Sequence, residues 1–230
     1  MVAGFFAALA SAQPAEGPDY LTLEELAFWY RTDKSRDDHK YSDVYGTLLS
    51  PIRLQVRNLT EVGVFNGASL QVWHDFLPHA HVYGIDISLR SIHPSSRAML
   101  EKTGRITLMQ GNCQNEADLE RFGLTEHSQD IVIDDGDHSA HGQQRTLQHM
   151  WRFLKPGGLY VIEDVMTGSP DGMLPPELDP TWGGKSLLVH APRNLTAYTR
   201  AVFAENDARS RVLATQLARR PKPAPCRSSL

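Results

Sequence analysis

The sequence predicts a Rossmann-like α/β fold with a mainly parallel sheet and helices on both faces of the sheet. Between residues 59 and 164, short apolar runs alternate with stretches of helical spacing, and this alternation is typical of βαβ units. A glycine-containing turn follows the first run, and acidic residues close the fourth and fifth. Because ligands of such folds lie at the carboxyl ends of the strands, the acidic residues indicate where a binding site should be.

Five strands and four intervening helices account for this region. The strands are expected at 59–64, 81–87, 105–110, 130–135 and 159–164. The helices are expected at 69–76, 95–102, 116–122 and 141–154. Proline cannot continue a helix and glycine supplies a left-handed turn, so Lys-Pro-Gly-Gly at 155–158 should end the last helix.

The flanking regions divide the chain further. Residues 1–20 form an N-terminal lead, and 21–58 hold a helix and a lid; Thr22 should cap that helix, with Glu25 completing a capping box. A methyltransferase-like domain is expected over 59–217 and a disordered tail over 218–230. The stretch 195–217 favours one or two helices, and no sixth and seventh strands are recognisable, so the sheet would be incomplete at its C-terminal edge.

Composition excludes several classes of function. The chain has 230 residues, 41% of them hydrophobic, and a net charge of −4. This charge offers no basic face for nucleic acid. No apolar run is long enough to span a membrane. A cytoplasmic location is expected, with the secretory pathway as the alternative if the apolar residues 1–12 are a signal peptide. The oligomeric state is left open, and a homo-oligomer is one outcome.

The first strand leads into a turn with two glycines. Gly63 and Gly67 let the backbone turn sharply and let a ligand approach it closely. The spacing is not that of the dinucleotide-binding motif, which disfavours NAD and favours a ligand without phosphates. Packing of a strand–turn–helix corner is the alternative explanation.

Polar residues follow the next two strands. Asp86, 25 positions after Glu61, ends the second strand, where a carboxylate can accept both hydroxyls of a ribose. The alternative is a helix cap. Asn112, after the third strand, would lie beside an adenine.

The fourth and fifth strands end in acidic residues. Asp134 and Asp135 are neighbours on a strand, so one should face the pocket while the other packs. Gathering Asp135, Glu163 and Asp164 at one edge requires a neutralising cation, and hard oxygen ligands favour Mg²⁺, Mn²⁺ or Ca²⁺. The alternative is a set of caps and rim charges. Histidine exchanges protons near neutral pH, so His138 is the candidate general base.

A polar and aromatic segment at 30–41 precedes the first strand. So dense a set of polar groups should not be core, and it could form a lid that carries Lys34 to a ligand carboxylate. A solvated connecting loop is the alternative.

Together these motifs resemble the metal-dependent sugar O-methyltransferases of macrolide and related natural-product pathways, which have the class I methyltransferase fold. The resemblance runs from about Thr32 to Thr167. It implies S-adenosylmethionine and Mg²⁺ (or Mn²⁺) as cofactors, a glycoside hydroxyl as acceptor, and His138 as base. By the same resemblance the metal ligands would be Asp135, Glu163 and Asp164. The cofactor would be held by Thr32, Lys34, Glu61, Gly63, Gly67, Asp86, Asn112 and Asp134.

The sequence departs from that family at three places. Asp137 stands where serine is usual, Asn112 where aspartate is usual, and Thr-Gly-Ser at 167–169 where Thr-Ser-Tyr is usual. The last change affects expected acceptor contacts. Three alternatives therefore stay open: a nucleotide-binding oxidoreductase, a hydroxylase-like protein, and a non-catalytic protein that keeps the cofactor pocket but has lost its substrate side.

Overall fold

The computed structural model describes residues 21–164 and the strands at 186–189, 198–203 and 212–216. Across these residues one sheet has the order β3-β2-β1-β4-β5-β6-β7-β8. Its strands are β1 (Asn58–Val62), β2 (His81–Asp86), β3 (Ile106–Gln110), β4 (Gln129–Asp134), β5 (Leu154–Ile162), β6 (Ser186–Val189), β7 (Tyr198–Phe203) and β8 (Val212–Gln216). The helices are α2 (Leu23–Tyr30), α3 (Tyr41–Leu49), α4 (Ala68–Phe76), α5 (Pro94–Lys102), α6 (Glu116–Phe122) and α7 (Ala140–Met150).

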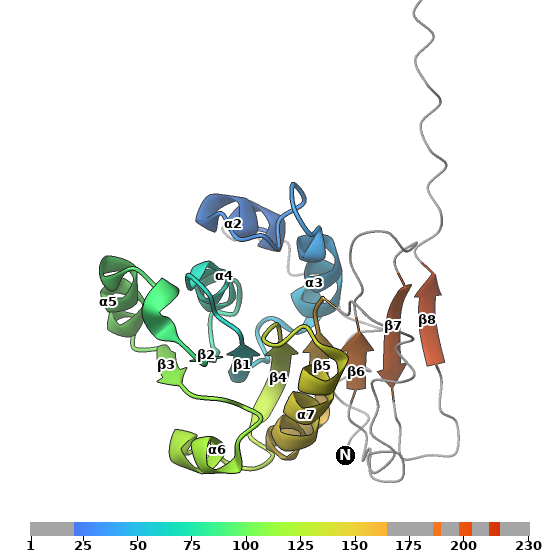
Figure 1. Ribbon diagram of the computed structural model, residues 1–230. Helices are drawn as coiled ribbons and strands as arrows, with labels where there is room; N and C mark the ends of the chain where they lie inside the picture. Colours follow the sequence, from blue (N-terminus) through green and yellow to red (C-terminus); the bar gives the residue numbers. More distant parts are fainter. Residues whose placement is uncertain (1–20, 165–185, 190–197, 204–211, 217–230) are drawn as a thin grey trace, which may run out of the picture.

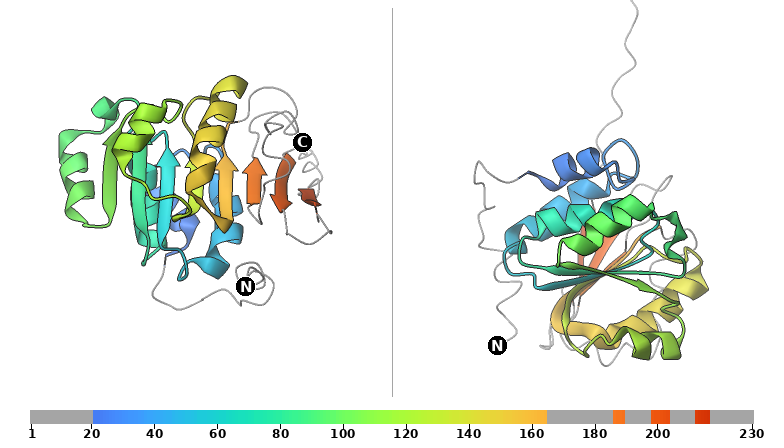
Figure 2. Two further views of the ribbon diagram at one scale, coloured as in Figure 1. Left: turned by 90° about the horizontal axis from the view of Figure 1, so that it is seen from below. Right: turned by 90° about the vertical axis from the view of Figure 1, so that its left-hand side faces the viewer.

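Helices cover both faces of the sheet, as predicted. Figures 1 and 2 show α2 to α5 on one face and α6 and α7 on the other. Strands β1 to β6 pair in parallel, whereas β7 and β8 are antiparallel to their neighbours. The chain proceeds from β1 outward to β3 and then returns to β4 on the other side of β1. This reversal opens a crevice at the carboxyl ends of β1 and β4.

The five predicted strands are confirmed. Their ends agree with the prediction within two residues, except that β5 begins at Leu154 rather than at residue 159. The three helices that follow β1, β2 and β3 are confirmed within one residue.

The expected end of the last helix was wrong. Helix α7 ends at Met150, a 3-10 turn covers Trp151–Phe153, and Leu154 already belongs to β5. The pairing of β4 with β5 shifts register between Gln129 and Ile131. The Lys-Pro-Gly-Gly sequence therefore forms an irregularity inside the strand, because a bulge, like a helix end, uses proline and glycine.

The expectation of helices across 195–217 and of a missing sheet edge was also wrong. Strands β6, β7 and β8 continue the sheet beyond β5. Each is only four to six residues long, and apolar runs this short do not distinguish a strand from part of a helix. The Thr-Gly-Ser at 167–169 and the predicted tail lie outside the described residues.

The N-terminal helix forms as predicted. The Thr22 hydroxyl accepts a hydrogen bond from the Glu25 amide at 3.2 Å, and the Glu25 carboxylate accepts one from the Thr22 amide at 2.7 Å. This reciprocal pair is the expected capping box. Leu23, Leu26 and Ala27 turn inward and are buried.

The segment after this helix is mostly exposed, but four of its residues contradict the expectation that it stays out of the core. Thr32, Lys34, Ser35 and Tyr41 are at most 5% exposed. Burial of such polar groups is tolerated when they pair with one another, and the partners of Lys34 and Tyr41 lie at the far ends of β4 and β5.

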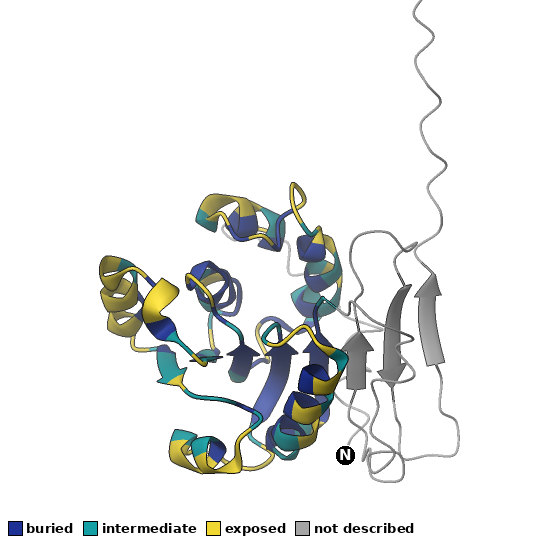
Figure 3. Cartoon of the chain, in the orientation of Figure 1, coloured by how far each residue is buried: buried dark blue, intermediate teal, exposed yellow. Residues whose placement is uncertain are grey.

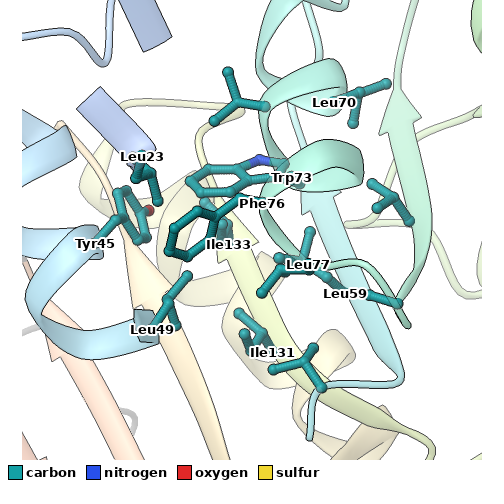
Figure 4. Close-up of a cluster of buried hydrophobic side chains, with 14 of the residues drawn as sticks. Leu23, Tyr45, Leu49, Leu59, Leu70, Trp73, Phe76, Leu77, Ile131 and Ile133 are labelled. Atoms are coloured by element: carbon teal, nitrogen blue, oxygen red, sulfur yellow. The ribbon is translucent and has the colours of Figure 1, made fainter. Parts of the chain in front are cut away.

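The larger apolar core lies between the sheet and helices α2 to α4. Trp73 of α4 is fully buried and meets Tyr45 of α3 edge-on, with ring centroids 4.9 Å apart. Leu59 and Ile133 close the cluster from the sheet (Figure 4). Exposed residues lie on the outer faces of the helices (Figure 3). Among the described residues, no helix has the length and apolar character needed to cross a bilayer.

Replacing Thr22 with alanine should lower the free energy of unfolding by about 1 kcal/mol, because an N-terminal amide of α2 loses its partner. Chemical denaturation measures this loss. Thr47→Ala is the matched control, since Thr47 is exposed within α3 and alanine favours helix. Equal stability of the two variants would show that the capping box does not stabilise the fold.

Candidate active site

A cleft of about 770 Å³ opens at the carboxyl ends of the central strands. Its walls come from the loops that follow β1, β2, β3 and β4 and from the end of β5. The lining includes Asp33, Gly63, Phe65, Asp86, Ile87, Asn112, Asp135, Asp137, His138 and Asp164. The cleft therefore lies where the reversal of strand order predicts a ligand.

The turn after β1 uses its two glycines differently. Gly63, at φ 83°, lies on the cleft wall. Gly67, at φ 81°, is the N-cap of α4 and is not among the cleft-lining residues. Both backbone angles are in the region that favours glycine. The sequence expectation of a sharp turn here is confirmed.

Asp86 fixes the same turn from the neighbouring strand. Its Oδ2 accepts hydrogen bonds from the amides of Val64 at 2.9 Å and Phe65 at 3.1 Å. Its Oδ1 accepts one from the Ser88 amide at 2.9 Å. Three backbone amides therefore fix the Asp86 carboxylate at one wall of the cleft.

Asn112 lines the cleft next to this wall. The backbone amide of Asn112 donates a hydrogen bond to the Asp118 carboxylate at 2.8 Å, and its side-chain oxygen accepts one from the Gln114 backbone amide at 2.9 Å. Two exposed apolar side chains, Phe65 at 71% and Ile87 at 70%, also border the cleft. The sequence analysis selected neither residue, because the exposure of an apolar side chain is not visible in the sequence.

Asp134 and Asp135 face opposite ways, as the alternation of a strand requires. Asp134 is fully buried, and its Oδ1 accepts from the Gly136 amide at 3.3 Å. Burial holds the pKa of Asp134 well above its usual range. Asp135 reaches the cleft. Asp134 therefore lies behind the cleft wall, and a direct contact with a cofactor is not supported by this arrangement.

A buried lysine connects three of the predicted site residues. Lys34 Nζ lies 2.7 Å from Asp135 Oδ2, 2.7 Å from Glu163 Oε2 and 3.6 Å from Glu61 Oε1. The lysine side chain is 3% exposed. The structure thus places Lys34 against the protein's own carboxylates and not at a ligand carboxylate.

The charges in this network do not balance. Burial opposes the charge of Lys34, but Glu163, Asp135 and Glu61 outweigh that effect and hold the lysine pKa above its usual value. Burial raises the pKa of Asp135 and of Glu163 despite the lysine. One ammonium therefore faces three carboxyl groups, two of them fully buried and the third, Asp135, at the cleft, and the network can accept further positive charge.

Two tyrosines of α3 bind the carboxylates at the end of β5. Tyr41 donates to Asp164 Oδ1, and Tyr45 donates to Glu163 Oε1. Residues four apart lie on one face of a helix, so α3 presents both hydroxyls to the same edge of the sheet. The sequence analysis gave neither tyrosine a role.

Asp135, His138 and Asp164 bring one ligand atom each within 4.8 Å of one another. His138 Nδ1 lies 3.5 Å from Asp164 Oδ2, and its side chain is 45% exposed. Glu163 is not part of this group, because its carboxylate turns inward to Lys34 and Tyr45. Two of the three predicted metal ligands thus meet at the cleft, with His138 beside them.

The remaining predicted residues lie behind the cleft. Thr32 is buried, and its hydroxyl lies 3.3 Å from Asp33 Oδ1. Glu61 is fully buried and accepts from the Ser69 hydroxyl at 2.7 Å. Asp33, which the sequence reasoning did not select, lines the cleft instead. Asp137, which stands where the resembled family usually has serine, accepts a hydrogen bond from Gln114 Nε2 at 3.2 Å and so links two loops of the cleft wall.

Comparison with known proteins identifies the type of domain. Residues 60–165 match the family model of a methyltransferase domain. The L-olivosyl-oleandolide 3-O-methyltransferase of Streptomyces antibioticus is 31% identical over 164 residues, which are 65% of this chain and 40% of that protein. The mycinamicin VI 2''-O-methyltransferase of Micromonospora griseorubida is 34% identical over 153 residues, 63% of this chain and 36% of that protein. The chain therefore spans about two fifths of the length of these relatives.

Solved structures agree with this result. The MycE methyltransferase of the mycinamycin biosynthetic pathway, in complex with Mg, SAH and mycinamycin VI, superposes with a TM-score of 0.56 at 30% identity. The superposition covers 68% of this chain and 43% of that one. The predicted class I methyltransferase fold and the resemblance to sugar O-methyltransferases are both confirmed.

The buried network predicts an unusual pH dependence. Burial raises the pKa of Glu61 from 4.5 to about 7, against the opposing effects of Lys34 and the Ser69 hydroxyl. A carboxyl group whose pKa is raised in the folded state contributes most to stability at a pH below its ordinary pKa. That contribution is lost as the pH rises through the raised pKa. Glu61→Gln should therefore remove a fall in unfolding free energy, on the order of 2 kcal/mol, between about pH 4.5 and pH 7.

Denaturation at a series of pH values measures this slope. Glu126→Gln is the control, because Glu126 is exposed and its replacement should keep the wild-type slope. A wild-type slope in Glu61→Gln would mean that Glu61 does not titrate in this window.

Proposed function

We propose that this protein, whose residues 60–165 match a methyltransferase domain, is an S-adenosylmethionine- and divalent-metal-dependent O-methyltransferase acting on a sugar or polyol hydroxyl of a small glycoside. The observation that carries the proposal is the meeting of Asp135, His138 and Asp164 at a cleft that Asp86 also lines. The relatives named above act on glycosylated natural products by their names, which supports this class of acceptor.

The cleft fits S-adenosylmethionine. Asp86 offers a carboxylate for the hydroxyls of a ribose, and Ile87 and Phe65 offer apolar surface beside it for a flat base. Asn112 adds amide hydrogen-bonding groups. When bound, the cofactor supplies an electrophilic methyl group on a positively charged sulfur. The acidic lining of the cleft, with Asp33, Asp86 and Asp135 among its residues, favours that charge.

The donor set fits a hard divalent cation such as Mg²⁺ or Mn²⁺. Asp135 and Asp164 offer carboxylate oxygens at the cleft, which are the ligands that such a cation prefers. Glu163, predicted as a third ligand, would have to turn away from Lys34 to join them. When bound, the ion lowers the pKa of a hydroxyl group that it contacts.

His138 is suited to take the acceptor proton. Its Nδ1 faces Asp164, which leaves Nε2 for the hydroxyl, and the carboxylate stabilises the imidazolium that results. With S-adenosylmethionine held beside Asp86, the deprotonated oxygen would be placed to attack the methyl carbon, and the cofactor would supply the sulfur that leaves. Most of the rate should come from holding the oxygen and the methyl group in contact and in line.

The other functional classes find less support. An oxidoreductase would need the missing phosphate-binding glycines. A hydroxylase with an iron site of two histidines and one carboxylate would need a second histidine, and the candidate ligand group among the described residues has only one, His138. A non-catalytic protein would bind the cofactor without turning it over.

We propose a cytoplasmic location, as the sequence led us to expect. Association into a homo-oligomer stays a prediction. The net charge of −4 continues to argue against a nucleic-acid acceptor.

Calorimetric titration with S-adenosylhomocysteine tests the cofactor half of the proposal. The protein should bind it with micromolar affinity, and Asp86→Asn should weaken binding about tenfold to a hundredfold, because the variant no longer offers a charged acceptor. Asp37→Asn, a change at an exposed aspartate, should bind as wild type does. Absence of binding to the wild-type protein, with and without Mg²⁺, would refute the proposal.

Release of S-adenosylhomocysteine from S-adenosylmethionine tests the reaction, with mycinamicin VI and L-olivosyl-oleandolide as acceptor probes. Asp135→Asn should lower the rate at least about a hundredfold, because loss of a metal ligand removes several kcal/mol of stabilisation. Its affinity for S-adenosylhomocysteine in EDTA should stay within about threefold of wild type. Full activity of the variant, or of wild type in EDTA, would rule out the metal.

A further inference from the structure

Gly63 lies against the backbone that carries Asp135. A Cβ atom added at Gly63 would be 2.1 Å from the Asp135 carbonyl oxygen, 2.5 Å from its carbonyl carbon and 2.8 Å from the Cα of Gly136. Real Cβ atoms do not approach backbone this closely. All three atoms belong to the turn between β4 and α7, so the missing side chain would collide with that turn and not with a ligand in the cleft.

The pairing of β1 with β4 explains this contact. Val62 pairs with Asp134, and the Asp135 amide donates to the Val62 carbonyl at 2.8 Å, one position beyond the end of β4. Gly63 is consequently the cross-strand neighbour of Asp135. Its φ of 83° turns the Cβ direction toward the adjacent strand, whereas an extended residue would direct it to a face of the sheet.

We propose that Gly63 is a positioning residue for Asp135, and thereby for the metal site, in addition to forming the cofactor turn. This inference rests on the proposed function. A side chain at position 63 would push the Asp135 backbone away from Val62 and separate its carboxylate from Asp164 and His138. The turn that borders the cofactor cleft and the carboxylate that binds the ion therefore share one backbone contact.

Two other glycines with positive φ, Gly67 and Gly104, supply the contrast. At Gly67 the nearest atom to an added Cβ is the flexible end of Leu100, at 2.9 Å, so that turn has no comparable backbone contact. At Gly104, with φ 71°, an added Cβ meets nothing within 4 Å. Gly104→Ala therefore reproduces the backbone strain of a left-handed alanine without the collision, and it is the matched control.

The experiment is a titration with Mn²⁺, followed by electron paramagnetic resonance of the free ion, in the absence of cofactor. Gly63→Ala should bind Mn²⁺ at least about tenfold more weakly than wild type, the size of effect seen when groups that orient a ligand are disturbed. Gly104→Ala should bind as wild type does. Affinity of Gly63→Ala for S-adenosylhomocysteine in EDTA should change less than its affinity for Mn²⁺, a split that a general loss of structure would not produce.

Equal Mn²⁺ affinity in wild type and Gly63→Ala would overturn this inference while leaving the proposed metal site intact. Absence of Mn²⁺ binding by the wild-type protein would overturn both. Should Gly63→Ala fail to fold, hydrogen exchange of the wild-type protein decides. Mg²⁺ should then slow exchange of the Asp135 and Gly63 amides together and leave Gly104 unchanged, and slowing at Asp135 alone would contradict the coupling.

Discussion

The arrangement of the active site depends on one buried ammonium group. Lys34 Nζ lies 2.7 Å from both Asp135 and Glu163 and 3.6 Å from Glu61. These carboxylates come from the ends of three parallel strands, where repulsion between like charges would otherwise separate them. A buried charge is tolerated only when paired, so the segment that carries Lys34 must stay packed over the sheet. The lysine thus determines both where that segment lies and how the acidic residues are spaced.

The residues behind the cleft wall and those on it have different roles. Groups behind the cleft wall hold the chain in place: the lysine binds Glu163 and Asp135, and Tyr41 binds Asp164. Groups on the wall stay available, among them Asp86, His138 and one face of Asp135. One ammonium for three carboxyl groups leaves negative charge at the cleft, which favours both a divalent ion and a sulfonium cofactor. The acidic residues therefore have two roles: the buried ones position the chain, and those that line the cleft are available for the proposed chemistry.

The sequence predicted what depends on local pattern and on strand order. Alternating runs placed β1 to β5, and the rule that ligands lie at the carboxyl ends of strands placed Asp86, Asp135 and Asp164 at one cleft. Partners far apart in the chain were not predictable. Lys34 meets Asp135 and Glu163 across 101 and 129 positions, and its polar neighbours suggested an exposed lid. Short strands such as β7 and β8 carry too few residues to show a period.

If Lys34 holds the three carboxylates together, the stability of Lys34→Met in EDTA at pH 7 should show it. Removing one partner of a buried ion pair leaves unpaired charge inside the protein. The free energy of unfolding of Lys34→Met should therefore be lower than that of wild type by about 3 kcal/mol or more. Lys102→Met, at an exposed lysine of α5, is the control and should stay within about 0.5 kcal/mol of wild type. Equal stability of the two variants would contradict the claim.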